Sequence, residues 1–152
     1  MTAFLMAAAL AFGTEDCVAV GDSLAVGMAM AINARVRGTS CRIAARKGAP
    51  ASRIARTMSI VRADVILLSA GANDAASPSL MQDLAVIRAR AMARQIIWVM
   101  PRHPRAAAAV RATCRYHGDV SVDLARFRTG DGIHPSDYDQ VARAAFHATT
   151  CQ

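Results

Sequence analysis

Five short apolar runs along the chain alternate with segments in which apolar residues recur at helical spacing. The clearest run is DVILLSAG at residues 64–71, which is continuous, so we expect a central strand that is covered on both faces. The other expected strands cover residues 17–21, 41–45, 95–101 and 119–125. Because such alternation places helices on both faces of a parallel sheet, the sequence predicts a three-layer α/β/α fold with a parallel five-stranded sheet.

The segments that follow these runs are predicted to be helices. They cover residues 24–36, 51–62, 78–94, 105–116 and 136–149. The chain has 152 residues, of which 54% are hydrophobic and only 5% aromatic, so an aliphatic core of useful size is expected. No internal repeat or low-complexity linker divides the pattern, and we expect one domain over residues 14–152.

The first residues form a separate apolar segment. Residues 3–12 are all apolar and end at Gly13, which is typical of a short secretory signal peptide, so we predict a signal peptide over residues 1–13. The segment is too short to cross a bilayer comfortably, and it lacks the usual positive charge at its start. The alternative is an additional helix that packs on the domain. The signal peptide predicts a periplasmic or secreted protein, and its absence a cytoplasmic one.

The four cysteines bear on the same question. Cys17 and Cys41 each begin an expected strand, and neighbouring parallel strands would bring them together. In an exported protein we expect disulfides Cys17–Cys41 and Cys114–Cys151. The alternative is four buried thiols in a cytoplasmic protein. No cysteine or histidine spacing matches a zinc site, so no metal is expected.

The chain is strongly basic. It carries 18 Lys and Arg against 11 Asp and Glu, for a net charge of +7, and this favours weak contact with anionic surfaces. The basic residues are scattered and not interleaved with aromatic ones, so we do not expect nucleic acid as a partner.

Residue types that carry chemistry collect after the expected strands, at the edge where parallel strands end and ligands bind. Ser23 follows the first strand, and Asp131 and His134 follow the last, so a turn can bring the Asp131 carboxylate to the His134 imidazole. A serine needs a base to remove its proton and a third group to orient that base. We therefore expect Ser23 as nucleophile, His134 as base and Asp131 as its orienting acid. The Ser23 backbone N–H, Gly48 and the Asn73 amide are candidate donors to an oxyanion.

Four sequence blocks extend this pattern: GDSL at 21–24, Gly48, GAND at 71–74 and DGIHP at 131–135. In this order they resemble the SGNH or GDSL hydrolases, a family of serine esterase- and lipase-like acylhydrolases. The resemblance implies a flavodoxin-like fold, no cofactor, the same Ser–His–Asp triad and the same three oxyanion donors. It also implies hydrolysis of carboxylic esters through an acyl-enzyme on Ser23, and we expect short acyl or acetyl groups, carried on a small molecule or a glycan.

Other interpretations of the same residues stay open. Within the enzyme class the alternative is a lysophospholipase or thioesterase, and outside it a catalytically weak module that binds polyanions or a cell surface on the same fold. Ser23 could be a helix cap and Asn73 a turn residue. Asp22 and Asp74 are expected to be structural. His103 follows the fourth strand beside Arg102, where it could either line the rim of the site or lie in an exposed loop.

Overall fold

The computed structural model describes residues 15–35 and 38–151, and it is an α/β fold. The elements follow in the order β1 (Glu15–Gly21), α1 (Ser23–Arg35), β2 (Cys41–Ala45), α2 (Ala51–Thr57), β3 (Val61–Ser69), α3 (Leu80–Ala89), β4 (Ala91–Met100), α4 (Pro104–His117), β5 (Val120–Asp123), a 3₁₀ turn (Leu124–Arg126), α5 (Tyr138–Ala145) and β6 (Thr149–Thr150). Within these ranges no helix has both the length and the apolar character needed to cross a membrane.

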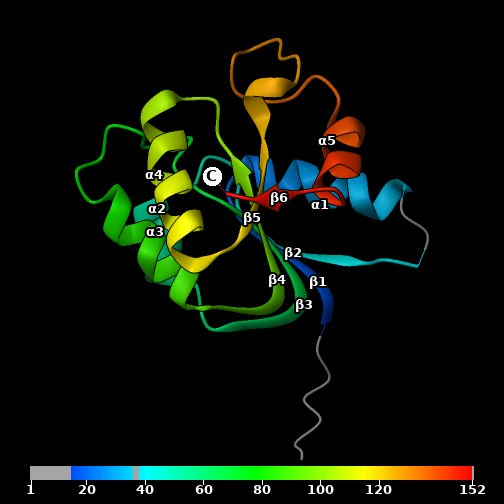
Figure 1. Ribbon diagram of the computed structural model, residues 1–152, viewed down its shortest axis with the longest axis horizontal. Coiled ribbons are helices and arrows are strands. Elements are labelled where there is room, and N and C mark those ends of the chain that lie inside the picture. Colours follow the sequence, from blue (N-terminus) through cyan, green and yellow to red (C-terminus); the bar gives the residue numbers. More distant parts are fainter. Residues whose placement is uncertain (1–14, 36–37, 152) are drawn as a thin grey trace, which may run out of the picture.

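The sheet has the strand order β2-β1-β3-β4-β5-β6. The first five strands are parallel, as predicted, and β6 pairs with β5 in the antiparallel direction. Helices α2, α3 and α4 lie on one side of the sheet, and α1 and α5 lie on the other (Figure 1). The three-layer α/β/α prediction is therefore confirmed.

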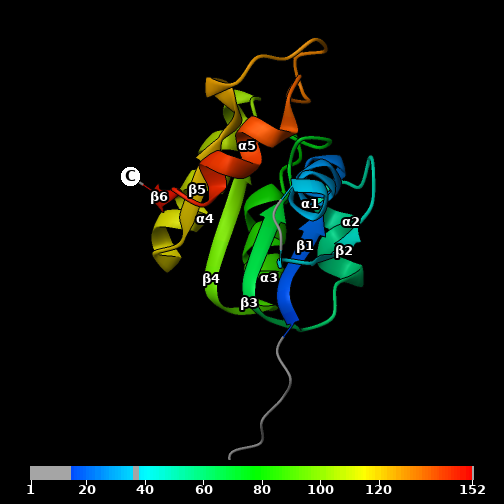
Figure 2. The ribbon, with the colours of Figure 1, turned by 90° about the vertical axis from the view of Figure 1, so that its right-hand side faces the viewer.

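Alternating residues of the buried strands supply the two cores. Val18 and Ile66 belong to the core on the side of α2, α3 and α4. Their neighbours Ala19 and Leu67 belong to the core under α1 and α5. This alternation is the two-residue period of a strand that is covered on both faces. The parallel strands end at the same edge, and residues 127–137, drawn in orange, form a loop beyond this edge (Figure 2).

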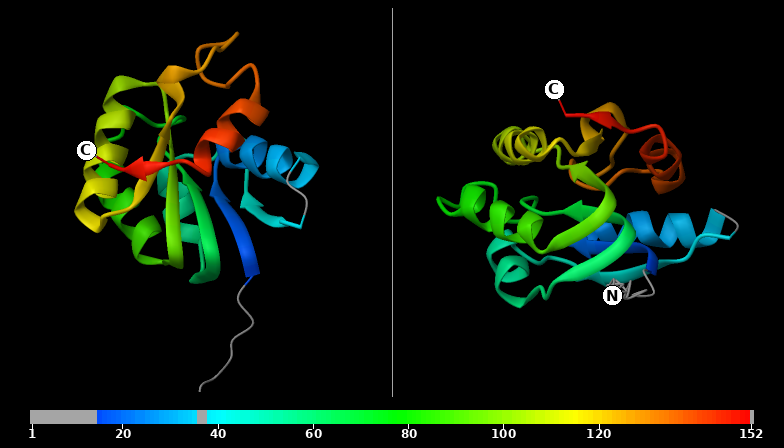
Figure 3. Two further views of the ribbon diagram at one scale, coloured as in Figure 1. Left: turned by 45° about the vertical axis from the view of Figure 1, so that its right-hand side comes forward. Right: turned by 60° about the horizontal axis from the view of Figure 1, so that its bottom comes forward.

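Three predicted helices end earlier in the structure than was predicted. The second helix ends at Thr57 rather than at residue 62, and the third ends at Ala89, so that Ala91 already begins β4. The last helix ends at Ala145 and is followed by β6, a sixth strand that was not predicted. Figure 3 shows β6, in red, at the opposite edge of the sheet from β2, in cyan. At the start of β4, pairing with β3 determines the structure of residues whose local pattern favours a helix.

Both expected disulfides are present, so the prediction of two pairs is confirmed. Cys17 and Cys41 are direct neighbours in the register of β1 and β2, with a Cα–Cα distance of 4.4 Å. Cys114 of α4 is bonded to Cys151, which follows β6, at a Cα–Cα distance of 5.9 Å. The signal-peptide prediction concerns residues 1–13, which lie outside the described residues, and it stays a prediction.

Candidate functional site

Ser23 lies at the junction between β1 and α1, and Gly21 makes this junction possible. Gly21 has a φ of 138°, and a Cβ atom built on it would lie 1.8 Å from the carbonyl oxygen of Ser69. The backbone N–H of Asp22 donates to that same oxygen at 3.2 Å. A residue with a side chain would therefore push the ends of β1 and β3 apart. The close approach fixes the point at which the chain leaves the sheet, and Ser23 is the first residue of α1.

The Asp22 carboxylate stabilises this junction through hydrogen bonds to both sides of it. It is fully buried, and its Oδ1 accepts hydrogen bonds from the backbone N–H of Leu24 at 3.0 Å and from the Ser69 hydroxyl at 2.8 Å. Burial raises the pKa of Asp22, and the hydrogen bond from Ser69 opposes this shift. Asp22 thus has the structural contacts expected from the sequence.

Ser23, His134 and Asp131 form one continuous chain of hydrogen bonds. The Ser23 Oγ lies 2.9 Å from Nε2 of His134, and Nδ1 of His134 lies 2.6 Å from Oδ2 of Asp131. When Nδ1 carries the proton and donates it to the carboxylate, the lone pair of Nε2 faces the serine hydroxyl. In this tautomer His134 can accept the serine proton, which is what activation of a serine requires.

The loop around Asp131 holds the carboxylate in position. Its Oδ1 accepts from the backbone N–H of Ile133 at 2.8 Å, from the backbone N–H of His134 at 2.7 Å, and from the Thr129 hydroxyl at 3.1 Å. The hydrogen bond to the His134 ring, followed by these backbone bonds, lowers the pKa of Asp131 well below its usual range. Asp131 is therefore a carboxylate whenever the imidazole needs a counter-charge.

Arg102 supports the segment that leads into this loop. Its Nη1 donates to the carbonyl oxygens of Leu124 at 2.8 Å and Phe127 at 2.7 Å. His103 is exposed at the start of α4. Both residues line a separate hollow beside Gly132 and Ile133, and neither lines the pocket that contains Ser23. Of the two alternatives for His103, the structure shows the exposed one.

The three candidate oxyanion donors lie around the same pocket. Ser23 provides one backbone N–H in the first turn of α1, where helical N–H groups have no partner within the helix. Gly48 lies in the turn after β2 with a φ of 72°, and nothing lies within 4 Å of a Cβ built there, so backbone conformation rather than space favours glycine. The Asn73 amide donates one hydrogen to the Ala49 carbonyl at 3.1 Å, which leaves its second hydrogen for a ligand.

These groups border a pocket of about 760 Å³. Its described lining includes Ser23, His134, Gly48 and Asn73 together with further residues from α1, the 46–49 turn and the start of α5. The Tyr138 hydroxyl is buried here without a hydrogen-bond partner among the described residues. Burial, followed by the charges of Asp22 and Asp131, raises the pKa of Tyr138 to about 12, so that the phenol stays neutral.

Sequence reasoning missed Tyr138 and the role of Gly27. A Cβ on Gly27 would lie 2.3 Å from the Tyr138 ring, so this glycine makes room for the aromatic wall of the pocket. One signal was available, because Gly27 lies four residues after Ser23 and therefore on the same face of α1. Within residues 15–35 and 38–151, no three His, Cys, Asp or Glu side chains are grouped so that they could hold a metal ion.

Comparison with solved structures shows an SGNH/GDSL hydrolase-like fold. A lipase/acylhydrolase from Enterococcus faecalis superimposes with a TM-score of 0.66 and 14% sequence identity, over 91% of this chain and 100% of that one. A member of the lipolytic protein G-D-S-L family from Veillonella parvula gives a TM-score of 0.60 at 13% identity, over 87% and 96% of the two chains.

A third similar structure is the C-terminal catalytic domain of Streptococcus pneumoniae peptidoglycan O-acetyltransferase A, in a form with a methylsulfonyl adduct. It gives a TM-score of 0.55 at 14% identity and covers 87% of this chain and 88% of that one. No protein-family model and no curated protein sequence matches the chain. The three likenesses concern the fold of the chain.

Proposed function

We propose that the protein is a serine esterase that cleaves carboxylic esters through an acyl-enzyme on Ser23. The observation that carries the proposal is the unbroken chain from the Ser23 hydroxyl through His134 to Asp131, at 2.9 Å and 2.6 Å. A helix cap needs no such chain, because a capping serine bonds to backbone N–H groups of its own helix. The arrangement is instead that of a nucleophile, its base and an orienting acid.

In the proposed reaction Ser23 Oγ attacks the ester carbonyl carbon while His134 Nε2 takes the hydroxyl proton. The carbonyl oxygen becomes an oxyanion and accepts hydrogen bonds from the Ser23 N–H, the Gly48 N–H and the second Asn73 amide hydrogen. Collapse breaks the bond to the alcohol oxygen, which leaves with the proton from His134. Water then attacks the acyl-serine with the same proton transfers, and the carboxylic acid and free Ser23 are released.

We propose short acyl groups, acetyl above all, as the part of the substrate that is transferred. The Tyr138 ring and Gly27 border the pocket, and its volume of about 760 Å³ leaves room for the alcohol part of the substrate beside a short acyl group. The likeness to a peptidoglycan O-acetyltransferase domain supports acetyl esters on a glycan, and the likeness to lipolytic proteins keeps a lysophospholipase or thioesterase as the second candidate. A binding module without turnover is the remaining alternative.

We also propose that the protein works in the periplasm or outside the cell. Its two disulfides, Cys17–Cys41 and Cys114–Cys151, support this location because disulfides persist in oxidising compartments and are rare in the cytoplasm. A signal peptide over residues 1–13 is the corresponding proposal for the start of the chain.

Turnover of nitrophenyl esters tests the function. The wild type should hydrolyse nitrophenyl acetate with a kcat/KM well above that for nitrophenyl decanoate, and Ser23→Ala should be inactive. Ser136→Ala is the matched control, because Ser136 is an exposed serine two residues after His134 and should keep full activity. A folded wild type without turnover on either ester, or an active Ser23→Ala variant, would overturn the proposal.

A further inference from the structure

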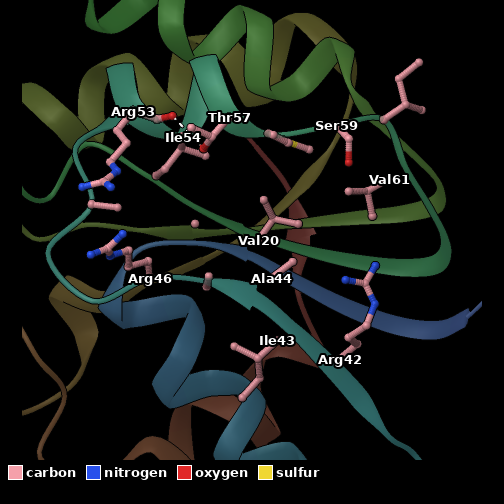
Figure 4. Close-up of a pocket in the computed structure, with 15 residues that line it drawn as sticks. Val20, Arg42, Ile43, Ala44, Arg46, Arg53, Ile54, Thr57, Ser59 and Val61 are labelled. Atoms are coloured by element: carbon pink, nitrogen blue, oxygen red, sulfur yellow. Dashed lines mark hydrogen bonds between the residues drawn. The ribbon is translucent and has the colours of Figure 1, made fainter.

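A second pocket, of about 470 Å³, lies between β2 and α2, apart from Ser23. Its floor is apolar and includes Val20 and Ile54, and three arginines, Arg42, Arg46 and Arg53, belong to its lining. Figure 4 shows the guanidinium groups of Arg46 and Arg53 at one end of the pocket and Arg42 toward the other. We call this hollow the arginine pocket.

The positive charge at one end of the arginine pocket comes from Arg46 and Arg53. None of its described lining residues is an Asp or a Glu. Within residues 15–35 and 38–151, no side chain makes an ion pair or hydrogen bond with the guanidinium groups of Arg46 or Arg53, and both residues are exposed. Two like charges that face the same space repel each other, so an anion placed between them is stabilised. Guanidinium groups bind carboxylates with paired hydrogen bonds.

The arginine pocket is joined to the Ser23 pocket by a single turn. Arg46 lines the arginine pocket, whereas the next two residues, Lys47 and Gly48, line the Ser23 pocket. The turn is closed by a hydrogen bond from the Ala49 N–H to the Arg46 carbonyl at 3.2 Å. Lys47 adds a positive charge on the Ser23 side of this turn, next to Arg46 on the other side. A polymer bound across the turn would therefore contact basic residues in both pockets.

We propose that the arginine pocket is a second binding site that holds the acid groups of an anionic polysaccharide, while an ester on the same chain reaches Ser23. This inference rests on the proposed function, since it names the class of polymer that carries the ester. A nucleic acid fits less well, because the described lining has no aromatic side chain on which a base could stack. A polysaccharide needs only carboxylate contacts and an apolar floor for its rings.

Binding is measured on Ser23→Ala protein, which cannot consume an ester, with alginate as the uronic acid polymer. Arg46→Gln/Arg53→Gln should raise the Kd about tenfold, because each exposed ion pair contributes up to about a fivefold gain in affinity. Arg56→Gln/Arg105→Gln is the matched control: it removes the same charge from exposed arginines that line neither pocket, and its Kd should stay within about twofold. Binding should weaken as salt is raised.

The catalytic arm uses the same variants with Ser23 intact. The Arg46→Gln/Arg53→Gln protein should lose about tenfold in kcat/KM on O-acetylated alginate and keep wild-type activity on nitrophenyl acetate and on acetylated dextran, which is neutral. Equal losses in both double variants, tighter binding of polyglutamate or single-stranded DNA than of alginate, or equal turnover of both acetylated polymers by the wild type would each overturn the inference. Inactivity on every ester together with arginine-dependent alginate binding would overturn only the proposed function and would support the binding site.

Discussion

Replacement of Asp131 by asparagine tests whether Asp131 sets the tautomer of His134, because the structure determines how the new amide will lie. Oδ1 of Asp131 faces three donors, the N–H groups of Ile133 and His134 and the Thr129 hydroxyl. The introduced asparagine must keep its side-chain oxygen in that place, since the reverse orientation would set its NH₂ group against two backbone N–H groups. Its NH₂ then takes the place of Oδ2 and points at Nδ1 of His134.

A donor in that position forces His134 into the other tautomer, with Nδ1 as acceptor and the proton on Nε2. Nε2 can then no longer accept the Ser23 proton across the 2.9 Å contact. We expect kcat on nitrophenyl acetate to fall by about 10⁴-fold, the typical cost of the wrong tautomer in a Ser–His–Asp triad. Part of the loss should be recovered at high pH, where hydroxide assists. The assay is a full pH–rate profile with kcat and KM fitted separately.

Asp137→Asn provides the control for the change of charge. Asp137 lies in the same segment and caps α5 by accepting from the backbone N–H of Asp139 at 2.9 Å. Asparagine caps a helix as well as aspartate does, so this variant carries the same charge change and should keep both activity and stability. If Asp131→Asn retained kcat within about tenfold of the wild type, or matched the Asp137→Asn pH profile, the tautomer argument would be refuted.

Three further predictions concern the surroundings of the triad. Asn73→Ala should lower kcat by about 10²–10³-fold with little change in KM and, unlike Asp131→Asn, without recovery at high pH; wild-type kcat would leave Asn73 as a turn residue. In a Tyr116→Phe background, ultraviolet titration should show Tyr138 ionising at about 12. The folded protein then holds the Tyr138 proton up to about pH 12, whereas the unfolded chain loses it from about pH 10.0, so the free energy of unfolding should fall between these two pH values. Ionisation of Tyr138 near 10.0 would contradict its buried position. Ser69→Ala removes a hydrogen bond to buried Asp22 and should lower the free energy of unfolding in urea by about 1–3 kcal/mol. The loss should be larger at pH 7 than at pH 4, because a hydrogen bond to a charged carboxylate is stronger. An unchanged urea midpoint would refute this contribution.

The edge of the sheet that carries the site follows from physical rules that act on short segments. Parallel strands end at the same edge, so the residues after β1 and β5 were expected at that edge although Ser23 and His134 are 111 positions apart. Because β3 and β4 lie between β1 and β5, the loop after β5 must return across the edge to bring His134 to Ser23. The disulfide between Cys17 and Cys41 was predictable for the same reason, because both cysteines begin adjacent strands.

The missed features depend on contacts between distant segments. Ala91–Gln95 consist of good helix formers, yet they extend β4 because they pair with Val61–Val65 of β3. The two residues of β6 carry too little pattern to be recognised, and their place is set by pairing with β5. The packing of Tyr138 on Gly27 depends on how α5 lies against α1, and no local sequence pattern determines that arrangement.

Covalent labelling with a fluorophosphonate shows whether Ser23 is an activated nucleophile, because an activated serine is labelled and a passive one is not. Intact mass analysis of the folded, disulfide-bonded protein should show one adduct, and peptide mapping should locate it on Ser23 next to the His134 ring. Ser23→Ala and Asp131→Asn should not label or should label far more slowly, whereas Ser136→Ala should label at the wild-type rate. A folded wild type that remains unlabelled, or an adduct on a residue other than Ser23, would contradict the account.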